Sequence, residues 1–448
     1  MNSAKRPNLL ILYPDQWRFD VLGSAGDPVI QSPNLDRLAR QGLRLTYAFV
    51  ASPLCTPSRG SLMTGRYPHK TGVMHNESPL PVTETGFAEP LRAAGYRTGY
   101  IGKWHLDGEA RPGFVPPERR HGWDYWAGFN RGHRYFDGVY FHDTATERQA
   151  VGFEPDHQTD LAIAFLEQSA RERESHFCLM VSWGPPHTPR DPPLRHQQTY
   201  TEQQFALSPS VPTELHETAR HERVGYYGLC TAIDDNVGRL LRTLDQLELA
   251  DDTIVLFTSD HGDSLGEHGL FRKTIPYDES TRVPFIIRWP EAIAADVTSD
   301  ALCHSVDVAP TLLSLCGVPA PAMQGYDLSS ALSLVDSGPR SEIYMEGEVG
   351  KNTPWGTGAN ALHALPDEWR ALRTHEHLIC TDVDGTVFLL FDVSSDPLAL
   401  KNLAGHPEWK EVQDTLLTRI RETAHKLEDH IPLGFGPDRT ARFMNNAN

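Results

Sequence analysis

Short, nearly unbroken apolar runs recur through the first 290 residues and alternate with segments of helical periodicity. Runs of this kind are typical of strands that are buried on both faces of a parallel sheet. The segments that we predict to be strands are residues 9–13, 45–50, 98–102, 177–183, 253–258 and 284–289. The pattern therefore predicts an α/β fold, a large mixed and mostly parallel sheet flanked by helices.

Helical segments lie between these strands. The longest carries an apolar stripe from Val224 to Leu247 at the helical period. Two shorter ones end at Gly42 and Gly95, as expected of a helix C-terminus. Further helices are predicted at about residues 159–169 and 310–316, and the one before Gly95 begins near Thr83.

The character of the chain changes at residues 333–340, where Ser, Asp, Gly and Pro cluster. Beyond them, residues 372–381 and 386–392 alternate across Asp384-Gly385, which predicts a β-hairpin, and residues 409–427 are helical. We therefore predict two domains. The first is a catalytic α/β domain of residues 1–338, and the second is a smaller α+β domain of residues 339–448 with an antiparallel sheet.

Reactive side chains follow five of the predicted strands at their carboxyl ends. They are Asp15 and Gln16, Cys55, Lys103 and His105, His187, and Asp260 and His261. In an open α/β sheet this edge is where ligand sites form, so we expect these side chains to lie close together.

Four of these residues offer ligands for a metal ion. Asp15, Gln16, Asp260 and His261 supply two carboxylates, an amide oxygen and an imidazole. Each has an ordinary explanation by itself, such as capping a turn, but together they predict one divalent cation. Oxygen ligands favour Ca²⁺, our first choice, or Mg²⁺, and the imidazole leaves Mn²⁺ open.

Cys55 lies where a loop enters a helix, with Pro57 suited to its first turn and Gly65 to its end. A helix N-terminus favours an anion, and Arg59 adds a cation one turn along. A buried structural cysteine is the ordinary alternative. However, the whole segment, Cys-Thr-Pro-Ser-Arg-Gly-Ser-Leu-Met-Thr-Gly-Arg, resembles the signature of the type I sulfatases.

The resemblance extends over nearly the whole chain. Type I, formylglycine-dependent sulfatases of the alkaline phosphatase superfamily also carry a Lys-x-His, a His in a Pro-rich loop and a later Lys, here Lys103 with His105, His187 and Lys273. The resemblance implies an alkaline phosphatase-like fold. It also implies that a maturation enzyme oxidises Cys55 to formylglycine, whose hydrate is the nucleophile and a further ligand of the metal.

The resemblance also implies a role for each residue of the site. Asp260 would help to take the proton of the nucleophile, while Arg59, Lys103 and Lys273 hold the ester oxygens. His187, together with Lys273, would protonate the leaving oxygen. His105 would deprotonate the second hydroxyl, which expels sulfate and restores the aldehyde.

The expected reaction is hydrolysis of a sulfate ester of a carbohydrate, or of an aryl sulfate. The pairs Asp15-Gln16 and Asp260-His261 also resemble those of phosphonate monoester hydrolases, so a phosphonate monoester or phosphodiester hydrolase is an alternative. A third possibility is an inactive glycan-binding protein with an unconverted Cys55. Residues 119–142 contain cations and aromatic residues, which suit a sulfated sugar or, equally, a solvated loop with structural tryptophans. Residues 351–370 suit a lid.

The net charge and the cysteines indicate which partners and which cellular compartment to expect. A formal net charge of −18 argues against nucleic acid or an acidic membrane as a partner. Six cysteines without a CxxC pair argue against a disulfide framework. We therefore expect a cytoplasmic protein, or a periplasmic one if a signal sequence has been removed, and the oligomeric state stays open.

Overall fold

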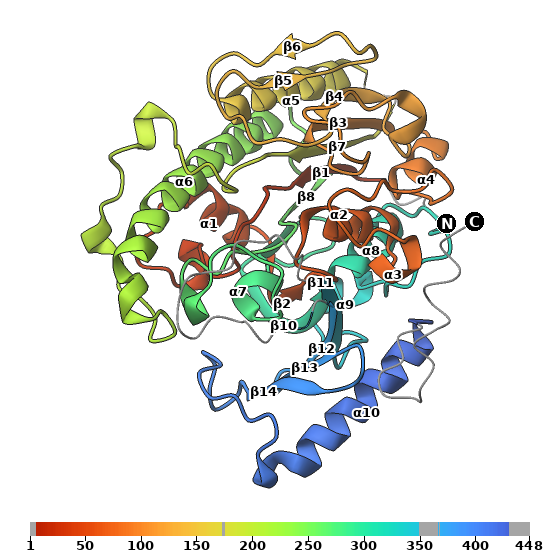
Figure 1. Ribbon diagram of the computed structural model, residues 1–448. Helices are drawn as coiled ribbons and strands as arrows, with labels where there is room; N and C mark the ends of the chain where they lie inside the picture. Colours follow the sequence, from red (N-terminus) through yellow and green to blue (C-terminus); the bar gives the residue numbers. More distant parts are fainter. Residues whose placement is uncertain (1–5, 173–174, 349–365, 367, 430–448) are drawn as a thin grey trace.

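The computed structural model describes residues 6–172, 175–348, 366 and 368–429. Its main element is an eight-stranded sheet in the order β10-β2-β9-β8-β1-β7-β3-β4 (Figure 1). The strands are β1 (Asn8–Leu12), β2 (Leu43–Phe49), β3 (Arg97–Lys103), β4 (Tyr125–Phe129), β7 (Phe177–Ser182), β8 (Thr253–Thr258), β9 (Phe285–Arg288) and β10 (Val297–His304). Only β9 is antiparallel to its neighbours β2 and β8. The predicted mixed, mostly parallel sheet is confirmed.

Helices cover both faces of this sheet because its strands are apolar on both sides. In β1, Leu9 and Ile11 face one core and Leu10 and Leu12 face the other. On one face lie α1 (Pro33–Arg40), α5 (Glu154–Arg171) and α6 (His216–Gln246); on the other lie α2 (Cys55–Thr64), α4 (Ala88–Ala93) and α8 (Ser305–Leu315). Among the described residues, no helix has the length and apolar character needed to cross a membrane.

Two predicted helices differ from the structure. The segment from Thr83 to Ala94 is helical only over α4, and the helix expected at residues 310–316 begins at Ser305, so Pro310 lies inside it. Three short α-helices also lie in the chain before the second sheet: α3 (Pro68–Thr71), α7 (Asp278–Thr281) and α9 (Ser329–Leu334).

A second sheet of four antiparallel strands follows, drawn in blue in Figure 1. It contains β11 (Ile343–Glu348), β12 (Glu368–Arg373), β13 (His377–Asp382) and β14 (Val387–Asp392), and α10 (Lys410–Lys426) packs on it. The hairpin at Asp384-Gly385 is confirmed. The single strand expected at residues 372–381 is wrong, because a turn closed by Thr374 N–H and the His377 carbonyl interrupts it. The domain boundary at residue 338 stays a prediction.

His69 lies on α3, the short helix that follows α2, and contacts this second sheet. Its Nδ1 lies 3.0 Å from Glu346 Oε1, and its Nε2 lies 3.1 Å from the carbonyl oxygen of Leu427. Both partners only accept hydrogen bonds, so both ring nitrogens carry protons and His69 is an imidazolium. Burial alone would lower the pKa of His69, but Glu346 and Asp429 outweigh it and raise that pKa above its ordinary value.

His69→Gln should therefore change the pH dependence of stability. A raised folded-state pKa gives stability that is fully present below the unfolded-state pKa, about 6.5, and is lost as pH rises through the folded value. Wild type should exceed the variant in unfolding free energy by about 1–2 kcal/mol in acid, and by less in alkali. Urea unfolding at several pH values measures this, with His425→Gln on the exposed side of α10 as control. A difference that does not vary with pH would contradict the imidazolium.

Candidate active site

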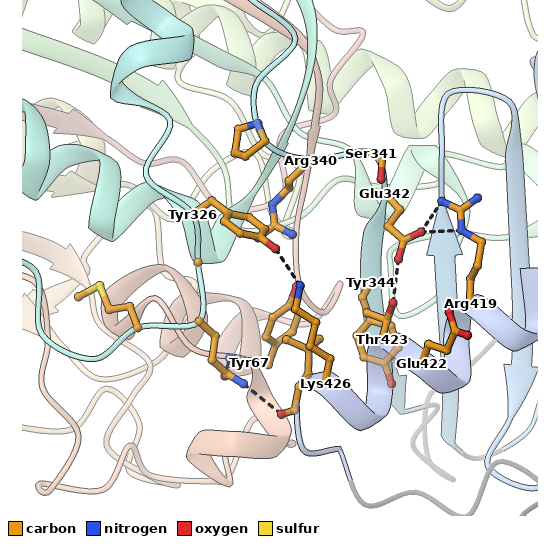
Figure 2. A pocket seen from close by; sticks show the side chains of 15 residues that line it. Tyr67, Tyr326, Arg340, Ser341, Glu342, Tyr344, Arg419, Glu422, Thr423 and Lys426 are labelled. Atoms are coloured by element: carbon orange, nitrogen blue, oxygen red, sulfur yellow. Dashed lines mark hydrogen bonds and ion pairs between the residues drawn. The ribbon is translucent and has the colours of Figure 1, made fainter.

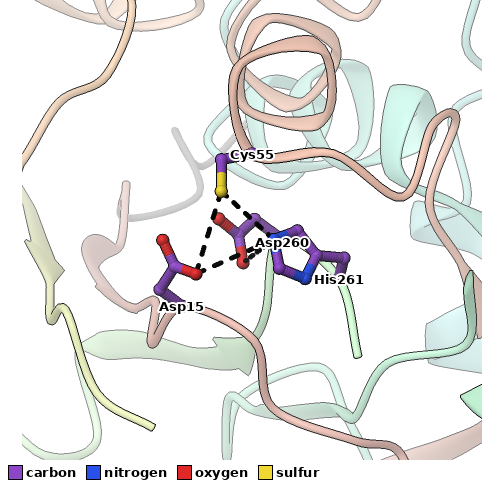
Figure 3. Close-up of side chains that lie close together, drawn as sticks. All are labelled: Asp15, Cys55, Asp260 and His261. Carbon is purple, nitrogen blue, oxygen red and sulfur yellow. Dashed lines mark hydrogen bonds and ion pairs between the residues drawn. The ribbon is translucent and has the colours of Figure 1, made fainter. Parts of the chain in front are cut away.

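Residues from three strand ends meet at the carboxyl edge of the main sheet. Asp15 follows β1, Asp260 and His261 follow β8, and Cys55 opens α2 after β2. One ligand atom from each of the four lies within 4.8 Å of the others (Figure 3). All four side chains are buried. The expectation that these residues gather is met because β1, β2 and β8 all run in the same direction.

Cys55 is surrounded by positive charge. Its Sγ lies 3.3 Å from both His261 Nε2 and Lys273 Nζ. Burial and Asp15 would raise the pKa of the thiol, but Lys103, Lys273 and His261 outweigh them and lower it to about 7. The other five cysteines are also buried and free of disulfides, and burial raises their pKa values. Cys55 is thus the one cysteine whose surroundings favour a negative charge.

Arg59 lies one turn further along α2 and holds the two carboxylates apart. Its Nε donates to Asp260 Oδ2 at 2.9 Å, and its Nη2 donates to Asp15 Oδ2 at 3.2 Å. Its Nη1 donates to the Lys103 carbonyl at 2.9 Å and to Ser182 Oγ at 2.8 Å. The sequence placed Arg59 against the ester oxygens of a substrate. Four of its five N–H groups bond the protein and fix the two carboxylates, and its contact with ester oxygens stays a prediction.

Lys103 and His105 leave the end of β3. Lys103 Nζ bonds Asp15 Oδ2, and with Arg59 it holds the pKa of Asp15 well below its ordinary value although burial alone would raise that pKa. Neither ring nitrogen of His105 has a hydrogen-bond partner within the described part of the chain. Burial, then Lys103 and Arg131, holds the pKa of His105 well below its ordinary value. His105 is therefore a neutral imidazole with both nitrogens free for a ligand.

His187 stacks on His133. Their ring centroids are 3.6 Å apart and the planes are 4° from parallel. His187 Nδ1 lies 2.7 Å from the Thr188 carbonyl, to which it donates, so Nε2 is free for a substrate. Burial, then His133, holds the pKa of His187 well below its ordinary value. His133 belongs to the segment of residues 119–142 that was expected near the substrate, but it follows β4, a strand that was not predicted, so its place beside His187 was not foreseen.

Gln16 adopts a left-handed backbone conformation, with φ of 73°. Its Oε1 accepts from Lys273 Nζ at 2.8 Å, and its Nε2 donates to Asp263 Oδ2. Burial would lower the pKa of His261, but Asp260 raises it above its ordinary value. Its Nδ1 lies 3.0 Å from the Gly262 carbonyl, so in the neutral ring Nε2 would present its lone pair to a cation. Two carboxylates, one amide oxygen and one imidazole fit a divalent cation, as the sequence analysis expected.

Three residues of the segment 119–142 are structural. Trp123 and Trp126 belong to the core, with side chains 3% and 1% exposed, so they offer no ring to a sugar. Arg120 is buried against the Trp126 ring and pairs with Asp143. For these residues the structural alternative is correct. Of the lid expected at residues 351–370, Trp369 is buried and donates to the Thr274 carbonyl at 3.1 Å, while Trp355 and His363 lie outside the described residues.

A separate cavity of about 640 Å³ lies beside α10 (Figure 2). Its lining includes three cations that already contact acceptors of the protein: Arg340 pairs with Asp307, Arg419 with Glu342, and Lys426 Nζ lies 3.2 Å from the Tyr326 hydroxyl. It contains none of the predicted site residues, so we do not regard it as a site for an anionic ester.

Comparisons with known proteins agree with this geometry. Residues 7–318 match the family model described as Sulfatase, and residues 266–426 match the model described as N-sulphoglucosamine sulphohydrolase, C-terminal. The chain is 35% identical to an ulvan-active sulfatase of Formosa agariphila, covering 96% of this chain and 83% of that protein. It is 27% identical to an N-acetylglucosamine-6-O-sulfatase of Bacteroides thetaiotaomicron, covering 96% and 88%.

A solved structure is similar over the whole fold. BT4656 in complex with its substrate D-glucosamine-2-N,6-O-disulfate has a TM-score of 0.84 and 26% sequence identity to this chain. The match covers 96% of this chain and 99% of that one.

The unconverted Cys55 thiol should ionise at an unusually low pH. In chelator-treated protein made without a maturation enzyme, the thiolate should appear as pH rises through about 7. Lys273→Met should move this midpoint upward, because it removes a cation that lies 3.3 Å from the sulfur. The ultraviolet absorbance of the thiolate, with Cys55→Ser subtracted, measures it, and Lys401→Met on the surface is the control. An ordinary midpoint in wild type would contradict the described charge balance.

Proposed function

The chain belongs to the type I sulfatase family of the alkaline phosphatase superfamily, and from that premise we propose that it hydrolyses sulfate esters of carbohydrates at Cys55. The observation that carries the proposal is the position of Cys55 at a helix N-terminus, in a buried group of two carboxylates and three cations. The relatives named for ulvan and for N-acetylglucosamine 6-O-sulfate support a sulfated sugar, as does the disulfated glucosamine bound by BT4656.

We propose that Asp15, Gln16, Asp260, His261 and residue 55 hold one divalent cation, with Ca²⁺ preferred. The bound ion supplies positive charge that polarises the ester and favours an ionised oxygen nucleophile. A maturation enzyme would convert Cys55 to formylglycine, whose hydrate provides that oxygen and a second hydroxyl for release of sulfate. A serine at this position would lack the second hydroxyl.

The charges of the site suit an anionic ester. Arg59, Lys103 and Lys273 exceed Asp15 and Asp260 by one positive charge before any ion is counted. Lys103 and Lys273 carry buried ammonium groups beside Asp15 and Cys55, respectively, so they are the cations that we assign to the ester oxygens. Arg59 keeps the carboxylates fixed while charge develops, which is the form of electrostatic stabilisation that costs least reorganisation.

The two histidines divide the proton transfers. His187 presents Nε2 because Nδ1 is bonded to the Thr188 carbonyl, so we assign it as the acid that protonates the leaving oxygen. The negative charge of a bound ester raises its protonated fraction. His105 is neutral and unpartnered, which suits a base that removes the proton whose loss releases sulfate.

A panel of esters tests the reaction. Wild type expressed with a maturation enzyme should release sulfate from sulfated sugars faster than from a nitrophenyl sulfate, and faster than it cleaves a phenyl phosphonate monoester. Cys55→Ala should lose at least about 10⁴-fold in rate. Faster phosphonate cleavage would favour the alternative hydrolase, in which Gln16 and His261 set the preference. Release that persists in Cys55→Ala would contradict both enzymatic proposals.

The leaving group tests His187. His187→Ala should lower kcat/KM about 10²–10⁴-fold for a sulfated sugar, because an alkoxide must be protonated as it leaves. The same change should cost much less for a nitrophenyl sulfate, whose leaving group is already a stable anion. Steady-state kinetics on both esters measure the ratio, and His221→Ala on the exposed surface is the control. Equal losses on the two esters would remove His187 from the role of acid.

A further inference from the structure

The side-chain amide of Gln16 lies between a group that only donates hydrogen bonds and a group that only accepts them. Lys273 Nζ donates to Oε1 at 2.8 Å, and Nε2 donates to Asp263 Oδ2. An ammonium group cannot accept, so the oxygen end of the amide must face Lys273. Lys273 Nζ also lies 3.3 Å from Cys55 Sγ, so this end of the amide faces the proposed cation site.

Asp263 is surrounded by donors. Its Oδ1 accepts from the backbone N–H groups of Leu265 at 2.9 Å and Arg272 at 3.0 Å. Its Oδ2 accepts from Arg190 Nη2 at 2.5 Å and from Gln16. The side chain is fully buried. Four donors saturate an ionised carboxylate, so Asp263 has a fixed orientation and offers Gln16 only an acceptor.

The backbone of Gln16 is fixed as well. Its N–H donates to Asp260 Oδ1 at 2.9 Å, and its carbonyl accepts from the Tyr226 hydroxyl at 2.7 Å. With φ at 73°, this residue keeps a conformation that a side chain disfavours, so the surrounding contacts hold it there. The remaining freedom is which end of the amide faces the cation.

We propose that Asp263 is a positioning residue that fixes the amide of Gln16 with its oxygen toward the cation site. An amide oxygen binds Ca²⁺, and an amide NH₂ does not. The arrangement also explains an amide at position 16, because a carboxylate there would face the charge of Asp263. The inference rests on the cation site of the proposed function.

Asp263→Asn tests it. The two backbone N–H groups require an oxygen at the position of Oδ1, so the new NH₂ would face both Gln16 and Arg190. The amide of Gln16 would then turn over and present its own NH₂ to the cation. We expect Ca²⁺ affinity to fall about 10–100-fold, the usual cost of losing such a supporting contact. Calorimetric titration of Ca²⁺ into chelator-stripped protein measures this without any enzyme assay. The matched control is Asp278→Asn, which changes another aspartate that is paired with an arginine, Arg373.

A second change distinguishes orientation from mere structural support. In the Asp263→Asn background, Gln16→Glu should restore Ca²⁺ affinity, because the new carboxylate accepts from the new amide and presents an oxygen to the cation. Gln16→Glu alone should bind less tightly than the double variant, since it sets two carboxylates against each other. If Asp263 only supports the loop, the double variant will bind no better than Asp263→Asn.

The outcomes are separable. Wild type that binds none of Ca²⁺, Mg²⁺ and Mn²⁺ overturns the proposed cation site and this inference with it. Wild type that binds, with Asp263→Asn binding equally well, overturns the inference alone. Circular dichroism in chelator shows whether each variant is folded. If Asp263→Asn does not fold, the double variant carries the test, and its failure to bind overturns the inference.

Discussion

The contact on which the site depends is the double ion pair of Arg59 with Asp15 and Asp260. The two carboxylates come from β1 and β8 and are fully buried with the guanidinium between them. Charges in such a place lose their hydration, and ion pairs of this kind seldom add stability over apolar packing. Removing one partner, however, leaves uncompensated buried charge, so the three side chains fix one another. Because Arg59 lies on the helix that begins at Cys55, the same contact also fixes the position of Cys55.

Backbone strain is found at this edge of the sheet, and packing of the surrounding elements holds the strained residues in place. Gln16 and His105 both have positive φ, at 73° and 59°, where residues with side chains are strained. Such positions persist when packed elements on all sides determine them. Here the support comes from strands buried on both faces and from the second sheet, which reaches the site through the hydrogen bond of Trp369 to the Thr274 carbonyl, next to Lys273.

Much of this architecture follows from local sequence. Strands such as β1 and β8 are continuous apolar runs, so their positions were predicted correctly. The prediction that Asp15, Asp260 and His261, which follow these two strands, lie close together was also correct. β4 was missed because its sequence, Tyr-Trp-Ala-Gly-Phe, is short and contains glycine, and β10 because its first half is polar and partly exposed. Because β4 was missed, the contact of His133 with His187 was not foreseen.

Ion pairs and hydrogen bonds between residues far apart in the chain could not be predicted from local sequence. The motif identified Arg59, but its ion pair with Asp260 spans 201 residues, and only the fold shows that its N–H groups are already engaged. The four donors around Asp263 come from residues 16, 190, 265 and 272, so its role is also visible only in the fold. Composition also cannot separate a tryptophan that binds sugar from one that fills a core, which is why Trp123 and Trp126 were left open.

We infer that this buried group of charges activates a nucleophile made from Cys55. Mass spectrometry of the peptide that spans Cys55, from protein produced together with a formylglycine-generating enzyme, tests it most directly. We expect the thiol to be replaced by the aldehyde in a large share of the protein. A thiol that stays intact, while the same enzyme converts a known substrate peptide, would contradict the account and favour a protein that only binds glycans.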